Sequence, residues 1–81
     1  MNQRFLAYSL RHQKTIKAIL MDEEGQIRNL NIQVTQLLEN GFNYTQRKKK
    51  QELFASYERL LSCGYARGDK GEIDLYGEKN E

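Results

Sequence analysis

One stretch decides the fold that this sequence predicts: residues 29–45, with the sequence NLNIQVTQLLENGFNYT. Residues 29–35 alternate between polar and apolar side chains, which is the period of a strand with one buried face. The apolar positions, which we expect to be buried, are Leu30, Ile32 and Val34. Asn40 and Gly41 follow, and because both residue types tolerate a positive φ they indicate a tight hairpin turn. Residues 42–45 resume the alternation, so the stretch predicts two paired strands.

The segments on either side of this hairpin have the composition of further strands and turns. Residues 15–21 are rich in β-branched side chains and lead into an acidic turn that ends at Gly25. Near the N-terminus, Phe5 and Tyr8 have the spacing of an amphipathic helix. In chain order we expect a helix over 2–12, strands over 15–21, 27–38 and 42–45, a basic loop or hairpin tip over 46–51, a strand over 53–55, a turn over 56–59 and a strand over 60–65. The predicted fold is therefore mainly β, with about five strands and an N-terminal α-helix.

A second interpretation of the same segments is helical. The apolar residues of 30–38 also fit helical spacing, and so do those of 53–61, with Gly64 as a residue that could follow the end of a helix. Residues 46–63 contain mostly acceptable helix formers. The alternative is a three-helix domain that resembles a small winged-helix module, and periodicity alone leaves both interpretations open.

The order of elements over residues 3–65 resembles that of small Sm-like or SH3-like barrels. It is also similar to the core of WYL-type regulatory domains, which close with an aromatic residue, a short turn and a pair such as Arg59-Leu60. The resemblance implies a small barrel. The chain has Phe42-Asn43-Tyr44 near the place of the Trp-Tyr-Leu tripeptide, so only the fold is inferred from it. Residues 65–69 also resemble the ending of small uncharacterised bacterial proteins, which implies no activity.

Length and composition are typical of one small folded domain. The chain has 81 residues, of which 38% are hydrophobic and 30% charged, and we expect a domain over 1–76 and a frayed acidic tail over 77–81. The single cysteine, Cys63, has no cysteine to pair with, and we expect it to be a buried thiol. No apolar run reaches the roughly 20 residues of a membrane span, and no signal-peptide core is present. We therefore expect a cytoplasmic protein that does not bind a membrane.

Charge is distributed unevenly along the chain. Residues 1–67 hold eleven Lys or Arg against six Asp or Glu, a net charge of +5, whereas residues 68–81 hold two against five, a net charge of −3. A basic body favours an anionic partner. The same distribution also fits a tail that only increases solubility and shields the body. Charge alone leaves both explanations open.

Few residues in the sequence are suited to catalysis or metal binding. The chain has one histidine, His12, and one cysteine, without an acid or nucleophile at a suggestive spacing. Residues 22–24 are adjacent acids, whereas a calcium loop distributes its ligands over about 12 residues. The tripeptide Arg67-Gly68-Asp69 is explained by a turn. We expect no catalytic residues, no metal site, no cofactor and no enzymatic activity.

A cluster of cations offers a binding site instead. The candidate nucleic-acid-binding residues are Arg47, Lys48, Lys49, Lys50, Tyr44 and Tyr57. Lysines in such a cluster contact phosphates, and aromatic rings stack on bases. The sequence therefore predicts a small binding module that binds nucleic acid or acts as a regulatory accessory protein. Equally, Phe42, Tyr44 and Phe54 could be core residues, with the cluster only keeping a hairpin tip soluble.

Self-association or binding to another protein is the alternative function. A small barrel leaves strand edges open, and an edge that pairs with a partner strand extends the sheet and buries apolar area. This interpretation predicts a protein partner or a homo-oligomer formed by strand pairing.

Overall fold

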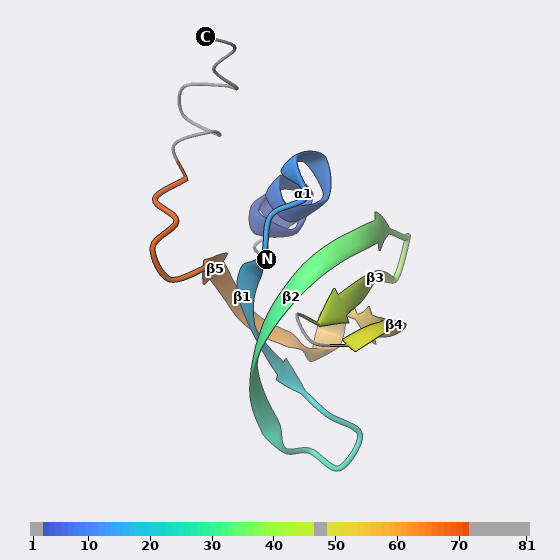
Figure 1. Ribbon diagram of the computed structural model, residues 1–81. Helices are drawn as coiled ribbons and strands as arrows, with labels where there is room; N and C mark the ends of the chain where they lie inside the picture. The colour runs from blue at the N-terminus through green and yellow to red at the C-terminus, as the bar shows by residue number, and fades with distance from the viewer. Residues whose placement is uncertain (1–2, 47–48, 72–81) are drawn as a thin grey trace, which may run out of the picture.

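The chain folds into one antiparallel sheet with a helix at its N-terminus, as the computed structural model shows (Figure 1). The structure describes residues 3–46 and 49–71. Its elements are α1 (Gln3–His12), β1 (Ile16–Met21), β2 (Ile27–Leu37), β3 (Gly41–Gln46), β4 (Lys49–Ser56), the 3-10 helix η1 (Tyr57–Arg59) and β5 (Leu60–Tyr65). The expected mainly β fold with five strands and an N-terminal helix is confirmed. The three-helix alternative is wrong, because residues 30–37 lie in strand β2 and residues 53–61 belong to β4 and β5 with only the short η1 between them.

The strands lie in the order β4-β3-β2-β1-β5, so the first strand is flanked by the second and the last. Ile16 of β1 lies opposite Ile32 of β2 on one side and Tyr65 of β5 on the other. Ile32 and Val34 are fully buried and Leu30 is half-buried, which confirms the face predicted from the alternation in β2. The sheet is not closed, since β4 and β5 are its two edges.

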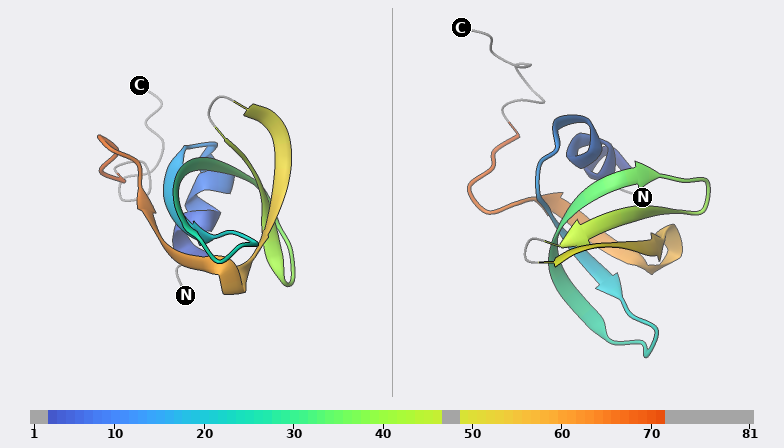
Figure 2. Two further views of the ribbon diagram at one scale, coloured as in Figure 1. Left: turned by 90° about the horizontal axis from the view of Figure 1, so that it is seen from below. Right: turned by 45° about the vertical axis from the view of Figure 1, so that its right-hand side comes forward.

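Irregular pairing bends the sheet into a curled shape. The register shifts between Ile19 and Leu20, between Val34 and Gln36, and between Tyr44 and Gln46. Bulges of this kind bend a strand and increase its twist. Figure 2 shows the result, in which the strands curl so that helix α1 lies across one end of their concave side.

Helix α1 is attached to the sheet by a buried hydroxyl as well as by apolar packing. Its buried residues are Leu6, Tyr8 and Ser9. The Ser9 hydroxyl donates a hydrogen bond to the carbonyl oxygen of Lys14 at 2.6 Å and accepts one from the backbone N–H of Val34 at 2.9 Å. This serine therefore fixes both the turn after the helix and the position of the helix against β2.

The two predicted hairpin turns are both present, but only one has the expected backbone. In the first, Gly25 has a φ of 81°, and a carboxylate oxygen of Asp22 accepts the N–H groups of Glu24 and Gln26 at 2.9 and 2.8 Å. In the second, neither Asn40 nor Gly41 has a positive φ, so the expected turn geometry is wrong. A Cβ atom on Gly41 would lie 2.6 Å from the ring of Phe54 and nearer still to a backbone oxygen of β4. Glycine is needed there for close approach rather than for a left-handed conformation.

The segment after β5 returns to helix α1. The N–H of Asp69 donates to the carbonyl of Ala66 at 2.9 Å, and Gly68 has a φ of 88°, so the predicted turn at residues 67–69 is confirmed. Asp69 accepts a hydrogen bond from the Tyr8 hydroxyl at 2.6 Å. Cys63 is buried, as expected. Residues 72–81, which include the predicted tail, lie outside the described residues.

Candidate binding sites

Two of the four residues of the predicted basic cluster, Lys49 and Lys50, lie at the beginning of a strand. β3 continues to Gln46, and β4 begins at Lys49, which lies opposite Gln46. Of the stretch expected as a basic loop or hairpin tip, Gln46 and residues 49–51 therefore belong to two paired strands. Lys49 and Lys50 are exposed, and neither forms an ion pair with another described residue. Arg47 and Lys48 lie outside the described residues.

The two tyrosines proposed to stack on bases lie away from these lysines. Tyr44 is only 7% exposed, its ring centroid is 5.8 Å from that of Phe42, and burial raises its pKa. Tyr57 is half-buried, and its hydroxyl donates a hydrogen bond to the carbonyl oxygen of Leu38 at 2.7 Å. The structure thus places both rings in or against the core and does not bring them together with Lys49 and Lys50.

Phe54 of β4, which one of the two interpretations of the aromatic residues places in the core, is exposed in the structure. Its side chain is 52% exposed, and it lies opposite Asn43 on the outer face of the sheet. The neighbours of Phe54 in the sequence are Leu53 and Ala55, which are also apolar. A run of three apolar residues gives no alternation from which the exposed one could have been found.

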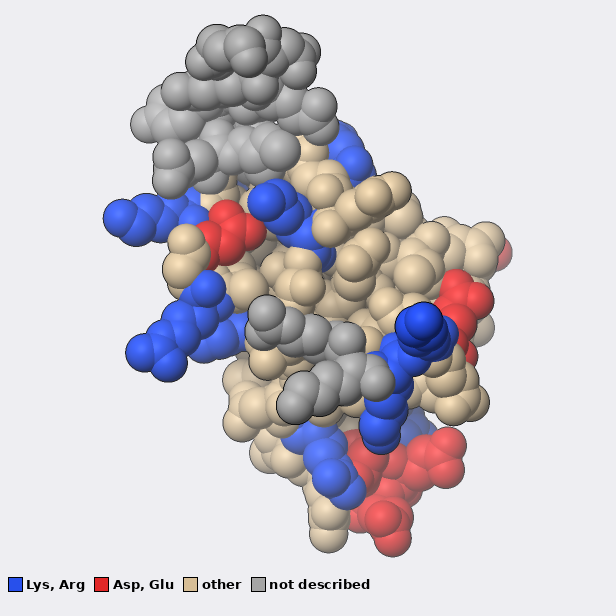
Figure 3. All heavy atoms as spheres, in the orientation of Figure 1, with Lys and Arg blue, Asp and Glu red and all other residues tan. Residues whose placement is uncertain are grey.

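Part of the outer face of the sheet is polar and carries a further cation. Asn29, Asn31 and Lys17 are exposed, and Lys17 of β1 lies opposite Asn31 of β2. In the view of Figure 3, the largest group of acidic side chains lies at the bottom, where the β1–β2 turn lies, and smaller acidic groups lie at the right and the upper left among Lys and Arg side chains. Charges of both signs are therefore mixed over most of this view.

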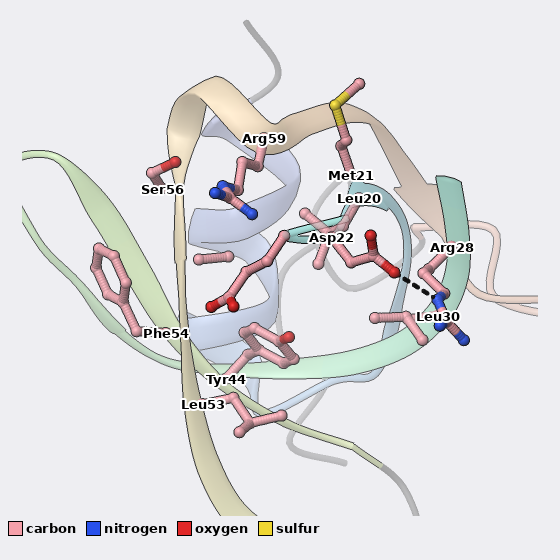
Figure 4. Close-up of a pocket in the computed structure, with 12 residues that line it drawn as sticks. Leu20, Met21, Asp22, Arg28, Leu30, Tyr44, Leu53, Phe54, Ser56 and Arg59 are labelled. Carbon is pink, nitrogen blue, oxygen red and sulfur yellow. Dashed lines mark hydrogen bonds and ion pairs between the residues drawn. The ribbon is translucent and has the colours of Figure 1, made fainter. Parts of the chain in front are cut away.

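A hollow with a volume of about 500 Å³ lies on the concave side, between the far end of the β1–β2 hairpin, β3, β4 and η1 (Figure 4). Apolar side chains line much of it. The lining residues are Leu20, Met21, Asp22, Glu23, Arg28, Leu30, Tyr44, Leu53, Phe54, Ala55, Ser56 and Arg59. Phe54 borders the hollow from β4, and its ring points away from it (Figure 4). These residues come from separate segments of the chain, and no sequence motif joins them, so sequence reasoning did not find this hollow.

Charged side chains stand at the rim of the hollow. The Nε atom of Arg28 lies 3.0 Å from a carboxylate oxygen of Asp22 (Figure 4). The backbone N–H of Gln26, and then Arg28, hold the pKa of Asp22 below its usual value. Among the described residues, neither Glu23 nor Arg59 has an ion-pair partner. The rim thus combines one neutralised pair with two separate charges of opposite sign.

The described residues do not form a metal site. No group of three or more His, Cys, Asp or Glu side chains within residues 3–46 and 49–71 could hold an ion. His12 lies beside Tyr8, with ring centroids 5.3 Å apart, and burial raises the pKa of Cys63, which disfavours the reactive thiolate. Within the same ranges, no helix is long and apolar enough to cross a membrane.

Comparison with known proteins adds no assignment. No family model matches the chain, and neither a curated protein nor a solved structure is significantly similar to it. Support for a function therefore comes from the chain's own surfaces and charges.

Proposed function

We propose that this chain is a small, non-enzymatic module with an Sm-like or SH3-like arrangement of strands, and that it binds nucleic acid through the start of β4. The exposure of Lys49 and Lys50, without a described carboxylate to neutralise them, is the observation that carries the proposal. Cations in this state attract phosphates and release the counterions that surround a nucleic acid. The strand order and the curled sheet support the proposed arrangement.

The outer face of the sheet offers two further kinds of contact. Asn29, Asn31 and Lys17 present amide groups and a cation on the outer face, and such groups form hydrogen bonds with phosphates and bases. Phe54, on the same strand as the lysines, has an exposed ring that can stack on a base. In this proposal Phe54 takes the stacking role that the sequence suggested for Tyr44 and Tyr57.

Salt-dependent binding of a labelled single-stranded oligonucleotide, followed by fluorescence anisotropy, tests the proposal. Each phosphate contact on a single strand contributes about 0.7 to the slope of log K against log salt, so loss of two contacts lowers the slope by about 1.4. We expect this from Lys49→Ala/Lys50→Ala. The matched control, Arg11→Ala/Arg67→Ala, removes the same charge from exposed positions elsewhere and keeps the slope. Equal slopes for the two double variants would refute the proposal.

Self-association through strand edges is a second candidate. The edge strands β4 and β5 each expose a large apolar side chain, Phe54 at 52% and Leu61 at 47%. Exposed apolar edge strands favour pairing with another chain. In light scattering we expect the native chain to have a mass that is a multiple of 9.6 kDa and does not change with salt, and we expect Leu61→Lys to be a monomer. A native chain that stays monomeric at every concentration would exclude this candidate.

A further inference from the structure

The hollow on the concave side has a binding chemistry that the proposed function does not use. Its apolar lining includes Leu20, Leu30 and Leu53, and its volume of about 500 Å³ lies within the range of small-molecule sites, about 300 to 1,000 Å³. Tyr44 also lines it, and its hydroxyl, which solvent can reach, forms no hydrogen bond with any described residue. The hollow therefore combines an apolar lining with a hydrogen-bonding group that a ligand can contact.

The rim supplies one positive and one negative charge that are not neutralised within the described chain. Arg59 extends from η1 toward the hollow (Figure 4), and Glu23 lines it from the β1–β2 turn. Asp22 and Arg28 already neutralise each other at 3.0 Å. The ligand that complements the two remaining charges has a carboxylate, an ammonium group and an apolar body.

We propose that the hollow binds a free α-amino acid with an aliphatic side chain. Arg59 binds its carboxylate, Glu23 binds its ammonium group, and its side chain lies against the leucines of the lining. A fatty acid complements the site less well, because Glu23 would face its carboxylate or remain unpaired. The N-terminus of a peptide fits less well too, because its first residue has no carboxylate for Arg59.

Three ligands with the same isobutyl group test the two charges separately in a titration followed by NMR chemical shifts, without nucleic acid. L-Leucine has both charges, 4-methylpentanoate has only the carboxylate, and 3-methylbutylamine has only the ammonium group. Hydrogen bonds to charged groups contribute about 1.5 to 3 kcal/mol, so we expect L-leucine to bind at least about tenfold more tightly than either analogue.

Two single substitutions at exposed positions assign the charges to residues. We expect Glu23→Gln to abolish the preference for L-leucine over 4-methylpentanoate and Arg59→Gln to abolish its preference over 3-methylbutylamine. The matched controls are Glu58→Gln, which changes the neighbour of Arg59, and Arg11→Gln on helix α1, and both keep the two preferences. Circular dichroism checks that every variant is folded.

Several results would overturn the inference. One is the absence of shifts at the residues of the hollow when L-leucine is added to the native chain. Another is equal binding of 4-methylpentanoate, which would assign the hollow to simple carboxylates. Equal binding of L-leucinamide, which lacks the carboxylate, would assign it to amines or peptide N-termini.

Discussion

Gly41→Ala adds one methyl group at the beginning of β3, where the structure leaves no room for it. The added Cβ atom would lie 2.6 and 2.7 Å from two carbon atoms of the Phe54 ring, and closer than that to the backbone carbonyl oxygen of Ala55. The Phe54 ring is half-exposed and can rotate away. The carbonyl oxygen belongs to β4, which pairs with β3, so the two strands must separate.

The expected cost follows from these contacts. Overpacking that displaces a backbone costs about 1 to 3 kcal/mol. Replacing glycine by alanine also reduces the conformational entropy of the unfolded chain, which stabilises the folded state by about 0.4 to 1 kcal/mol. The midpoints of these two ranges differ by about 1.3 kcal/mol, and we expect Gly41→Ala to lower the free energy of unfolding by about that amount. For a domain of this size each kcal/mol lowers Tm by about 4 to 8 °C, so Tm falls by roughly 5 to 10 °C.

Gly64→Ala is the matched control, because Gly64 also lies in a strand but a Cβ atom there meets no atom within 4 Å. Its φ is not in the left-handed region. We expect this variant to unfold at the same Tm as the native chain or slightly above it. Thermal and urea unfolding followed by circular dichroism measure both variants. If Gly41→Ala is as stable as Gly64→Ala, the argument from close approach is refuted.

Three other substitutions test hydrogen bonds that link distant parts of the chain. Ser9→Ala leaves the N–H of Val34 without its partner, and we expect it to lower the free energy of unfolding in urea by about 2 to 3 kcal/mol. A decrease below about 0.5 kcal/mol would contradict the role of this hydroxyl. Tyr57→Phe removes the hydrogen bond to Leu38, and we expect a loss of about 1 kcal/mol by the same method, with an unchanged midpoint as the contrary result. The Tyr8 hydroxyl lowers the pKa of Asp69 in the folded chain, so the ionised carboxylate stabilises the fold. This contribution to the free energy of unfolding is fully present above the pKa of about 3.9 in the unfolded chain and is lost as pH falls through the lower pKa in the folded chain. Tm of Asp69→Asn should therefore fall less steeply in acid than that of the native chain, and identical pH profiles would show that this carboxylate contributes nothing.

Much of the fold could be predicted from the sequence because local patterns and tertiary structure agree. In β2, Ile32 and Val34 lie on the buried face that the alternation indicates. The turn at Gly25 forms as its residues predict, with the Asp22 carboxylate accepting two backbone N–H groups. The helical spacing in residues 30–38 was misleading, since partner strands rather than propensity determine such a segment.

The features that sequence reasoning missed depend on contacts between distant segments. Ser9 is polar and was not predicted to be buried, because its partner Val34 lies 25 residues away. The bulge between Val34 and Gln36 changes the face of the strand, so Leu37 rather than Gln36 lies opposite Phe42. Local alternation cannot indicate such a shift. The hollow was missed for the same reason, because only the curled sheet brings its lining together.

The position of β1 between β2 and β5 has a consequence for the order in which the chain is made. β1 ends at Met21, and β5 begins only at Leu60. Ribosomes add about 5 to 20 residues per second, so roughly 2 to 8 s separate the synthesis of these two strands. During that interval the nascent chain can pair β1 with β2 on one side only. The other side of β1 is then a transient edge that a chaperone or a second nascent chain can reach before β5 covers it.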